Sequence, residues 1–499
     1  MRLGVLDLLA DARDAGWLDR VYGAYFRRQF ASIMPQAVSV WCRELGHDVC
    51  YRTYYGQADP RDLLPVDLDV VFVSAYTQAS ALAYALAKLY RADGALTVIG
   101  GPHAKAFPGD CLRFFDIVVK DCDRRLIEEI LARRFDPPTV VTSGRLLTEF
   151  PSVEERMPEI AAASFADGRP LLTSVVPMLA SLGCPYSCDF CIDWSSKYVP
   201  LTRDRIVADL RYTAEHLPNV YVVYHDPNFG VRFDEMMDVI EEVPAVRRSR
   251  YLMESSLSIL KPQRLERLRA TRCVYVAPGV ESWTDYASKA GVGDRCGRAK
   301  LERVVDHFSL LREFVPGLQA NFLFGTDADA GNEPVELTKE FFRRVPFVFP
   351  TVNIPTPFGG TPLHARVLEE GRILETMPFA FYFIPNLVIR IRNYDPVEYY
   401  GHLIDMHETI SSCLTIARRL LADGPVALRF LHAVRSFGVK RDLAELRCIH
   451  RKLKSDRSFQ AFHDQRSKPL PVYYRHQLNR RLGHYASLLS DDDLRPVLH

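Results

Sequence analysis

The sequence predicts an α/β protein built in three parts. Over residues 1–135, short apolar strands alternate with helical segments, which is the pattern of a doubly wound parallel sheet. Residues 136–170 are irregular and contain several prolines, so we expect a linker there. Strand–helix units repeat six times over residues 171–375, and residues 376–499 have helical spacing with clusters of Tyr and Phe. A chain of 499 residues is long enough for these two or three domains.

The first domain offers a ligand site at one edge of its sheet. We expect its strands at Leu3–Leu8, Asp48–Arg52, Leu68–Ser74, Leu96–Ile99 and Phe115–Val119. The third of these is a continuous apolar run, typical of a parallel strand buried on both faces. Ligands of such sheets bind beyond the carboxyl ends of the strands. The residues there are Ser74 and Thr77 after the third strand, and Gly100, Gly101 and His103 after the fourth.

The second part begins with a strand that leads into three closely spaced cysteines. Cys184, Cys188 and Cys191 are spaced C-x3-C-x2-C after the apolar run 171–182. Thiolates select zinc, copper(I) or iron–sulfur clusters. A structural zinc site needs four ligands, and the nearest downstream histidines, His216 and His225, are not at zinc spacing. Three thiolates on a four-iron cluster would leave one iron open to an exogenous ligand. Zinc and three unrelated core cysteines are the alternatives.

This motif, with Phe190 just before the third cysteine, resembles the signature of the radical S-adenosylmethionine (SAM) family. The resemblance implies a partial (β/α)6 barrel of the TIM type over residues 171–375, with the site at the C-terminal mouth of its strands. It also implies that Cys184, Cys188 and Cys191 hold a 4Fe–4S cluster. SAM would chelate the open iron, and its reductive cleavage would give a 5′-deoxyadenosyl radical.

Polar residues at the ends of the predicted barrel strands resemble further elements of that family. Gly279–Ser282 resembles its Gly-Ile-Glu-Ser element, and Asp226–Phe229 resembles its Asp-x-Asn-Phe element. The resemblance implies SAM contacts at Phe190, Glu254, Ser255, Glu281 and Gly325. It implies a place on the substrate side for Asp226, Asn228 and Phe229. One departure is the segment 325–329, which replaces the family's Gly-x-Pro-Gly-Glu turn.

The first domain resembles the cobalamin-binding domain that precedes many radical SAM domains. This implies corrinoid contacts at Ser74, Thr77, Gly100, Gly101 and His103. The segment Asp11–Gly16 has the spacing of the cobalt-ligating D-x-H-x-x-G motif, but Arg13 stands where the histidine would be. A Gly-Glu-Gly sequence often found after the fifth strand is also replaced, here by Lys120–Asp123. The alternatives are a domain that does not bind cobalamin and a His103 that only caps the following helix.

Composition and charge exclude several classes of partner. The chain is 48% hydrophobic and 25% charged with a net charge of +1, so no global field favours nucleic acid or membrane. No apolar run approaches the roughly 20 residues that span a bilayer. An iron–sulfur enzyme with 11 cysteines requires a reducing compartment, so we expect a cytoplasmic protein. Residues 414–483 carry 16 Lys and Arg against 5 Asp and Glu, which indicates either a solvated helical face or attraction to an anionic substrate.

Together these resemblances imply a cobalamin-dependent radical SAM methyltransferase. It would use methylcobalamin and the 5′-deoxyadenosyl radical to methylate an unactivated carbon of a small molecule in secondary metabolism. The alternative is a non-methylating rearrangement, cyclisation or oxidation by the same cofactors. A non-catalytic cobalamin carrier is a third hypothesis, against which the intact cysteine motif argues. We expect a monomer that takes an anionic or phosphate-linked substrate and electrons from flavodoxin or ferredoxin, with no nucleic-acid or membrane partner.

Overall fold

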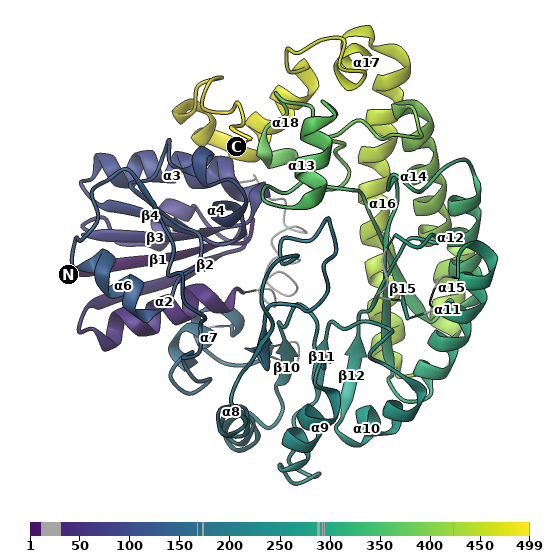
Figure 1. Ribbon diagram of the computed structural model, residues 1–499, viewed down its shortest axis with the longest axis horizontal. Helices are drawn as coiled ribbons and strands as arrows, with labels where there is room; N and C mark the ends of the chain where they lie inside the picture. The colour runs from purple at the N-terminus through teal and green to yellow at the C-terminus, as the bar shows by residue number, and fades with distance from the viewer. Residues whose placement is uncertain are drawn as a thin grey trace.

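The predicted three-part α/β architecture is confirmed in the computed structural model (Figure 1). The model describes residues 1–10, 31–166, 168–171, 174–286, 290–291, 293, 295–422 and 424–498. The N-terminal sheet lies on one side of the molecule and the second parallel sheet on the other. The C-terminal helices arch between them, so that the end of the chain returns to the N-terminal domain beside α3 (Ser80–Ala92).

The N-terminal sheet is parallel throughout, with strand order β2-β1-β3-β4-β5-β6. Its strands are β1 (Arg2–Leu8), β2 (Asp48–Tyr54), β3 (Val70–Ala75), β4 (Leu96–Gly100), β5 (Ile117–Val119) and β6 (Thr139–Val141). The connections leave β1 and β3 in opposite directions, so the topological switch point lies between these two strands. The expected linker requires a correction, because β6 and α7 (Met157–Ser164) come from it. A strand of three residues has no apolar run long enough to reveal it.

Alternating side chains of this sheet divide its core into two layers. Leu3 and Val5 face α2 (Ile33–Glu44) and α6 (Arg124–Leu131), whereas Leu6 and Leu8 face α3 on the opposite side. This division follows from the period of two residues along a strand. Two short helices, α4 (Pro102–Ala106) and α5 (Pro108–Cys111), follow β4 at the C-terminal edge of the sheet.

The second sheet is an open parallel barrel. Its strands are β7 (Val175–Met178), β10 (Tyr221–Tyr224), β11 (Tyr251–Met253), β12 (Cys273–Val276), β13 (Gly279–Glu281), β14 (Gly317–Leu323) and β15 (Val348–Asn353). The order is β7-β10-β11-β12-β14-β15, and β13 continues the line of β12 along β14 after a break at Pro278. Proline lacks the N–H that a ladder needs, which explains the break. Among the described strands β7 and β15 do not pair, so the barrel stays open.

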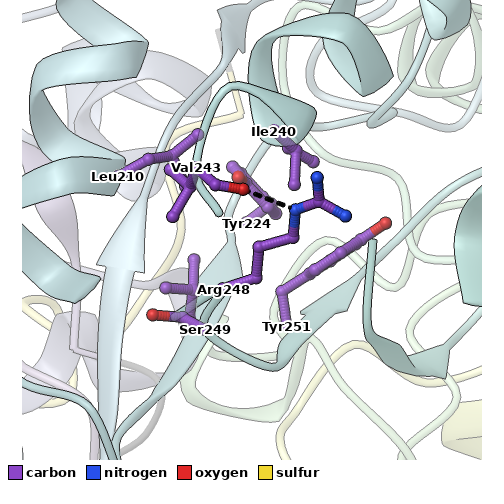
Figure 2. A pocket seen from close by; sticks show the side chains of 8 residues that line it. Leu210, Tyr224, Ile240, Val243, Arg248, Ser249 and Tyr251 are labelled. Carbon is purple, nitrogen blue, oxygen red and sulfur yellow. Dashed lines mark hydrogen bonds between the residues drawn. The ribbon is translucent and has the colours of Figure 1, made fainter. Parts of the chain in front are cut away.

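Helices cover the outer face of the barrel. They are α8 (Arg203–His216), α9 (Phe233–Glu241), α10 (Leu265–Ala270), α11 (Gly297–Arg312) and α12 (Glu333–Arg344). The helix after β15, α13 (Pro362–Glu369), instead lies beside α18 (Val472–Leu482) (Figure 1). Figure 2 shows a cavity between α8, α9 and the outward side chains Val222, Tyr224 and Tyr251. Its volume of about 10 Å³ suits one water molecule at most. This cavity is too small for a substrate. The alternate residues Val223 and Leu252 face the inside of the barrel and are half-buried.

The C-terminal region is helical, as predicted. It contains α14 (Pro396–Ser411), α15 (Cys413–Leu421), α16 (Val426–Ser455), α17 (Arg457–His463) and α18 (Val472–Leu482). The final residues fasten the chain end to the first domain, since Asp493 pairs with Lys88 at 2.6 Å and the N–H of Val497 donates to Asp110 at 2.9 Å. No helix among the described residues has the length and apolar character needed to cross a membrane.

Candidate functional site

The three cysteines lie on a loop at the mouth of the barrel, between the antiparallel strands β8 (Ser181–Leu182) and β9 (Val199–Pro200). Cys184 is 8% exposed, and Cys188 and Cys191 are half-buried. The loop begins at Gly183, whose φ is +67°. A Cβ at this position would lie 2.3 Å from the carbonyl oxygen of Lys197, so the close approach of the segment just before β9 requires glycine.

Asp226 fixes the backbone that leads into this loop. It follows β10 and is 2% exposed, and its carboxylate accepts hydrogen bonds from the N–H of Ala180 and the hydroxyl of Ser181. Burial raises the pKa of Asp226 to about 6, against the effect of these hydrogen bonds. Sequence reasoning expected this residue on the substrate side. The structure places its carboxylate under the segment before the cysteines, where it positions the loop.

A second carboxylate, Asp189, fastens the loop from within. It accepts hydrogen bonds from the hydroxyl of Tyr286 at 2.6 Å and from Arg366 at 2.8 Å. The ring of Phe190 stacks on Tyr286, with centroids 5.9 Å apart, and the N–H of Leu363 donates to the carbonyl of Asp189. Asp189, Tyr286 and Arg366 were not predicted as site residues. The position of Asp189 inside the cysteine motif was the one signal that could have indicated a role.

The cysteine loop fits an iron–sulfur cluster better than a single metal ion. Among the described residues, no group of three or more His, Cys, Asp or Glu side chains converges closely enough to bind one metal. A four-iron cluster does not require such convergence, because each thiolate binds a different iron. All eleven cysteines lie in the described ranges, and no disulfide joins any two of them. The loop therefore offers three soft thiol ligands, the donor set that suits an iron–sulfur cluster.

The predicted SAM contacts occupy two kinds of environment. Glu254 is exposed after β11, and Glu281 is half-buried at the end of β13 with φ +63°, a conformation that costs free energy and is concentrated at functional sites. A Cβ on Gly279 would lie 2.2 Å from Oε1 of Glu281, so the carboxylate folds back over a residue without a side chain. Ser255 instead donates a buried hydrogen bond to the carbonyl of Phe229.

Three other predicted residues are buried in the barrel. Gly325 has φ +94° and lies under α14, where a Cβ would be 2.5 Å from the ring of Tyr399. Phe229 is fully buried against Tyr224 and Tyr251, so its ring belongs to the core. Asn228 is 2% exposed, and within the described residues its amide oxygen and nitrogen have no hydrogen-bond partner. A buried amide in this state is a place where a ligand can bind.

The C-terminal edge of the N-terminal sheet has the features of a cofactor platform. Asp7 and Ser74 are paired in register across β1 and β3, at the switch point. Asp7 accepts from the N–H of Ser32, while its Oδ1 is buried without a hydrogen bond in the described part of the chain. Burial raises the pKa of Asp7 to about 6. Gly101 has φ +88° and packs on Ser74, where a Cβ would meet the hydroxyl at 2.9 Å, and Gly100 beside it has no close neighbour.

His103 and Thr77 lie behind this edge. Thr77 is 4% exposed in a turn after β3. His103 is fully buried, and its Nε2 bonds to the hydroxyl of Tyr84, which also donates to Asp110. Burial lowers the pKa of His103 to about 3, so the imidazole is neutral. The side chain of His103 does not cap α4, because it belongs to this buried network. The segment Asp11–Gly16 with Arg13 lies outside the described residues.

The two sheets meet so that both C-terminal edges face one junction. Arg156 is 1% exposed and joins them, since it donates to Gln36 of α2 at 2.7 Å and to the carbonyl of Pro177 of β7 at 3.1 Å. Lys105 of α4 donates to Ser196, just after the cysteine loop, at 3.2 Å. Tyr76 follows β3 and is 38% exposed. The pKa of its phenol is raised, first by partial burial and then by the negative charges of Asp7 and of Glu254 in the barrel.

Comparison with known proteins identifies the barrel. Residues 178–329 match the model of the radical SAM superfamily, so this part of the chain is a radical SAM domain. The bacteriochlorophyllide d C-8(2)-methyltransferase of Chlorobaculum tepidum is 23% identical over 420 residues, which cover 78% of this chain and 87% of that protein. The hopanoid C-3 methylase of Methylococcus capsulatus is 23% identical over 236 residues, which cover 46% of this chain and 43% of that protein.

Solved structures share the whole architecture. The radical SAM methyltransferase TsrM of Kitasatospora setae, determined with cobalamin and a [4Fe-4S] cluster bound, has a TM-score of 0.56 and 14% identity, covering 89% of this chain and 99% of that one. The cobalamin-dependent SAM radical enzyme OxsB, determined with aqua-cobalamin, has a TM-score of 0.58 and 12% identity, covering 99% of this chain and 82% of that one. At these identities the likeness establishes the fold.

Proposed function

We propose that this protein is a cobalamin-dependent radical SAM enzyme that methylates an unactivated carbon of a small molecule. The observation that carries the proposal is the junction itself. A three-cysteine loop at the mouth of an open barrel faces the C-terminal edge of a doubly wound sheet, and Arg156 and Lys105 hold the two together. Two relatives named as carbon methyltransferases match across most of the chain and support this choice of reaction.

Residues of the barrel would hold the cluster and SAM. When bound, these groups supply a radical that removes a hydrogen atom from the substrate, and cobalamin supplies the methyl group. Cys184, Cys188 and Cys191 are the cluster ligands, while Asp226 and Asp189 keep their loop in place. The carboxylates of Glu254 and Glu281 are suited to accept hydrogen bonds from the amino and ribose hydroxyl groups of SAM.

Residues of the first domain would hold cobalamin at the switch point. Gly100 lets the backbone approach a large flat ligand, while Gly101 packs closely on β3 beside the hydroxyl of Ser74. The unpartnered Oδ1 of Asp7 can accept a hydrogen bond from such a ligand. His103 cannot serve as a direct contact from its buried position. The substrate would then lie between the domains, near the amide of Asn228.

Anaerobically purified and reconstituted protein tests the proposal. Its absorption spectrum should show iron–sulfur and corrinoid bands together. Incubation with SAM labelled in its methyl group, a reductant such as flavodoxin or ferredoxin, and candidate substrates should give 5′-deoxyadenosine and a product that carries the label. If 5′-deoxyadenosine forms together with a rearranged or oxidised product that carries no label, the enzyme performs the alternative chemistry and not methylation. A spectrum without corrinoid bands after reconstitution would refute the role of cobalamin.

A further inference from the structure

Two arginines of the C-terminal helices reach the inner face of the barrel. Arg435 of α16 donates to the hydroxyl of Tyr275 on β12 and to Oε1 of Gln319 on β14, both at 2.7 Å. Gln319 alternates with the residues Leu318 and Ala320, which are buried in the core under the outer helices, so it lies on the inner face. A cation from α16 is therefore placed inside the barrel, on the side away from α11 and α12.

Arg419 of α15 lies next to Arg435. It is 1% exposed and donates through Nη1 to the carbonyl of Ile410 and to the hydroxyl of Ser436. Both guanidinium groups lie over the ring of Phe349 on β15, at 5.4 Å for Arg419 and 3.9 Å for Arg435. The Nε and Nη2 atoms of Arg419 are buried and have no hydrogen-bond partner in the described part of the chain.

Within the described residues, no carboxylate compensates the charge of this pair. Neither arginine forms an ion pair with any carboxylate of the described residues. His432 packs between Phe349 and Tyr275, and its Nε2 is also buried without a partner. Burial and Arg435 lower the pKa of Arg419 to about 10, so the guanidinium is still charged at neutral pH. A buried guanidinium beside a second, half-buried one is costly without a counter-ion, and proteins normally satisfy such groups.

We propose that Arg419, Arg435 and His432 form a binding site for an oxyanion, namely a carboxylate or phosphate group of the substrate. The Nε and Nη2 atoms of Arg419 form one edge of its guanidinium, and this edge donates two parallel hydrogen bonds to a carboxylate or phosphate. Arg435, which also lies over the ring of Phe349, supplies a second positive charge. The assignment of the oxyanion to the substrate rests on the function proposed above.

The position of this oxyanion site constrains the shape of the substrate. Gln319 lies four residues before Leu323, the last residue of β14, which is about 13 Å along the strand. Between them, the half-buried Asn321 and Thr351 hydrogen-bond to each other at 2.6 Å on the inner face. A substrate held at the arginines would extend along this face toward the cysteine loop. The substrate is therefore elongated, with its acidic group at the end remote from the reacting carbon.

Thermal unfolding of the full-length protein tests the site with simple anions. Inorganic phosphate or acetate, compared with chloride at equal ionic strength, should raise the Tm of the wild type by about 1–2 °C at saturating concentration. The anion with the larger shift identifies the substrate's acidic group as phosphate or carboxylate. Arg435→Gln should abolish the shift. Arg418→Gln, which alters the exposed neighbour of Arg419, should keep it.

Two results would overturn the oxyanion site: a wild type that responds to neither anion, and equal responses in the wild type and Arg435→Gln. Arg419→Gln provides a second variant, and Arg435→Gln carries the test if Arg419→Gln does not fold. Absorption spectra of the same samples separate this proposal from the first. If the cluster and corrinoid bands are absent but the anion still raises the Tm, the proposed function alone is refuted. If the bands are present but the anion does not raise the Tm, the oxyanion site alone is refuted.

Discussion

The barrel mouth and the edge of the N-terminal sheet face the same junction, but their polar groups differ in how completely they are hydrogen-bonded. At the barrel mouth, Asp226, Asp189 and Asp329 each accept hydrogen bonds from at least two groups. At the sheet edge, Oδ1 of Asp7 is buried without a partner in the described part of the chain. The carboxylates at the barrel mouth are therefore fully hydrogen-bonded, whereas Asp7 at the sheet edge is not, and at the barrel mouth the amide of Asn228 is the group left open for a ligand.

This difference matches what each edge would bind. Ligands to a cluster must be held closely in place, so the loop that carries them is fixed by side chains that themselves have defined partners. A large cofactor held without covalent bonds brings its own donors and acceptors, and these can satisfy groups that the protein leaves open. The contrast gives a physical reason to assign the cluster to the barrel and cobalamin to the sheet.

The largest effect is expected from removing a cluster ligand. Cys188→Ala should abolish the iron–sulfur absorption and the cleavage of SAM, because a four-iron cluster cannot be held by two thiolates. The corrinoid bands should persist, since the sheet edge is a separate site. Iron analysis and the absorption spectrum measure both. Cys413→Ala, which removes an exposed cysteine at the start of α15, is the matched control and should behave as the wild type. Loss of both sets of bands in Cys188→Ala would show that the two edges are not independent.

Removing the acceptor under the cysteine loop should have the next largest effect. Asp226→Ala leaves the buried N–H of Ala180 and the hydroxyl of Ser181 without their acceptor, which costs about 1–3 kcal/mol. We expect a lower free energy of unfolding in urea and less iron bound after reconstitution. Asp306→Ala, on the exposed face of α11, is the control. Unchanged iron content in Asp226→Ala would show that the loop keeps its position without this carboxylate.

The fold was largely predictable because its strands are continuous apolar runs, such as the one that became β3. The cysteine loop was predictable because its spacing is local. The roles of Asp226 and His103 were not, because the partners that bury them, Ser181 and Tyr84, lie 45 and 19 residues away. The arginine pair could not be found either, since Arg435 meets Gln319 across 116 residues. The SAM and cobalamin contacts stay predictions.

Asp7 resembles Asp226 in that burial raises its pKa against the effect of its hydrogen bonds. Its folded-state pKa of about 6 lies above the ordinary value of 3.8, so the folded protein binds a proton more tightly than the unfolded chain. The wild type therefore loses stability as pH rises from about 4 to about 6. Asp7→Asn does not titrate, and its stability relative to the wild type should rise over that window by about 1–2 kcal/mol. Urea unfolding at several pH values measures this, with Asp306→Asn as the control. A difference that does not change with pH would show that Asp7 is not the titrating group.

The smallest expected effect distinguishes the SAM site from the cobalamin site. Gly279→Ala places a Cβ 2.2 Å from Oε1 of Glu281, so the carboxylate must move, while the strained backbone at φ +63° gives it little freedom to adjust. We expect SAM to bind about tenfold more weakly, which is about 1.4 kcal/mol. Corrinoid content should be unchanged, because Gly279 lies on the barrel.

Gly438→Ala, at an exposed position of α16 with no neighbour within 4 Å, should leave SAM binding intact and stabilise the helix by about 0.5–1 kcal/mol. Calorimetric titration with SAM measures the affinity. If Gly279→Ala lowered the corrinoid content and left SAM affinity unchanged, the assignment of the two cofactors to the two edges would have to be reversed.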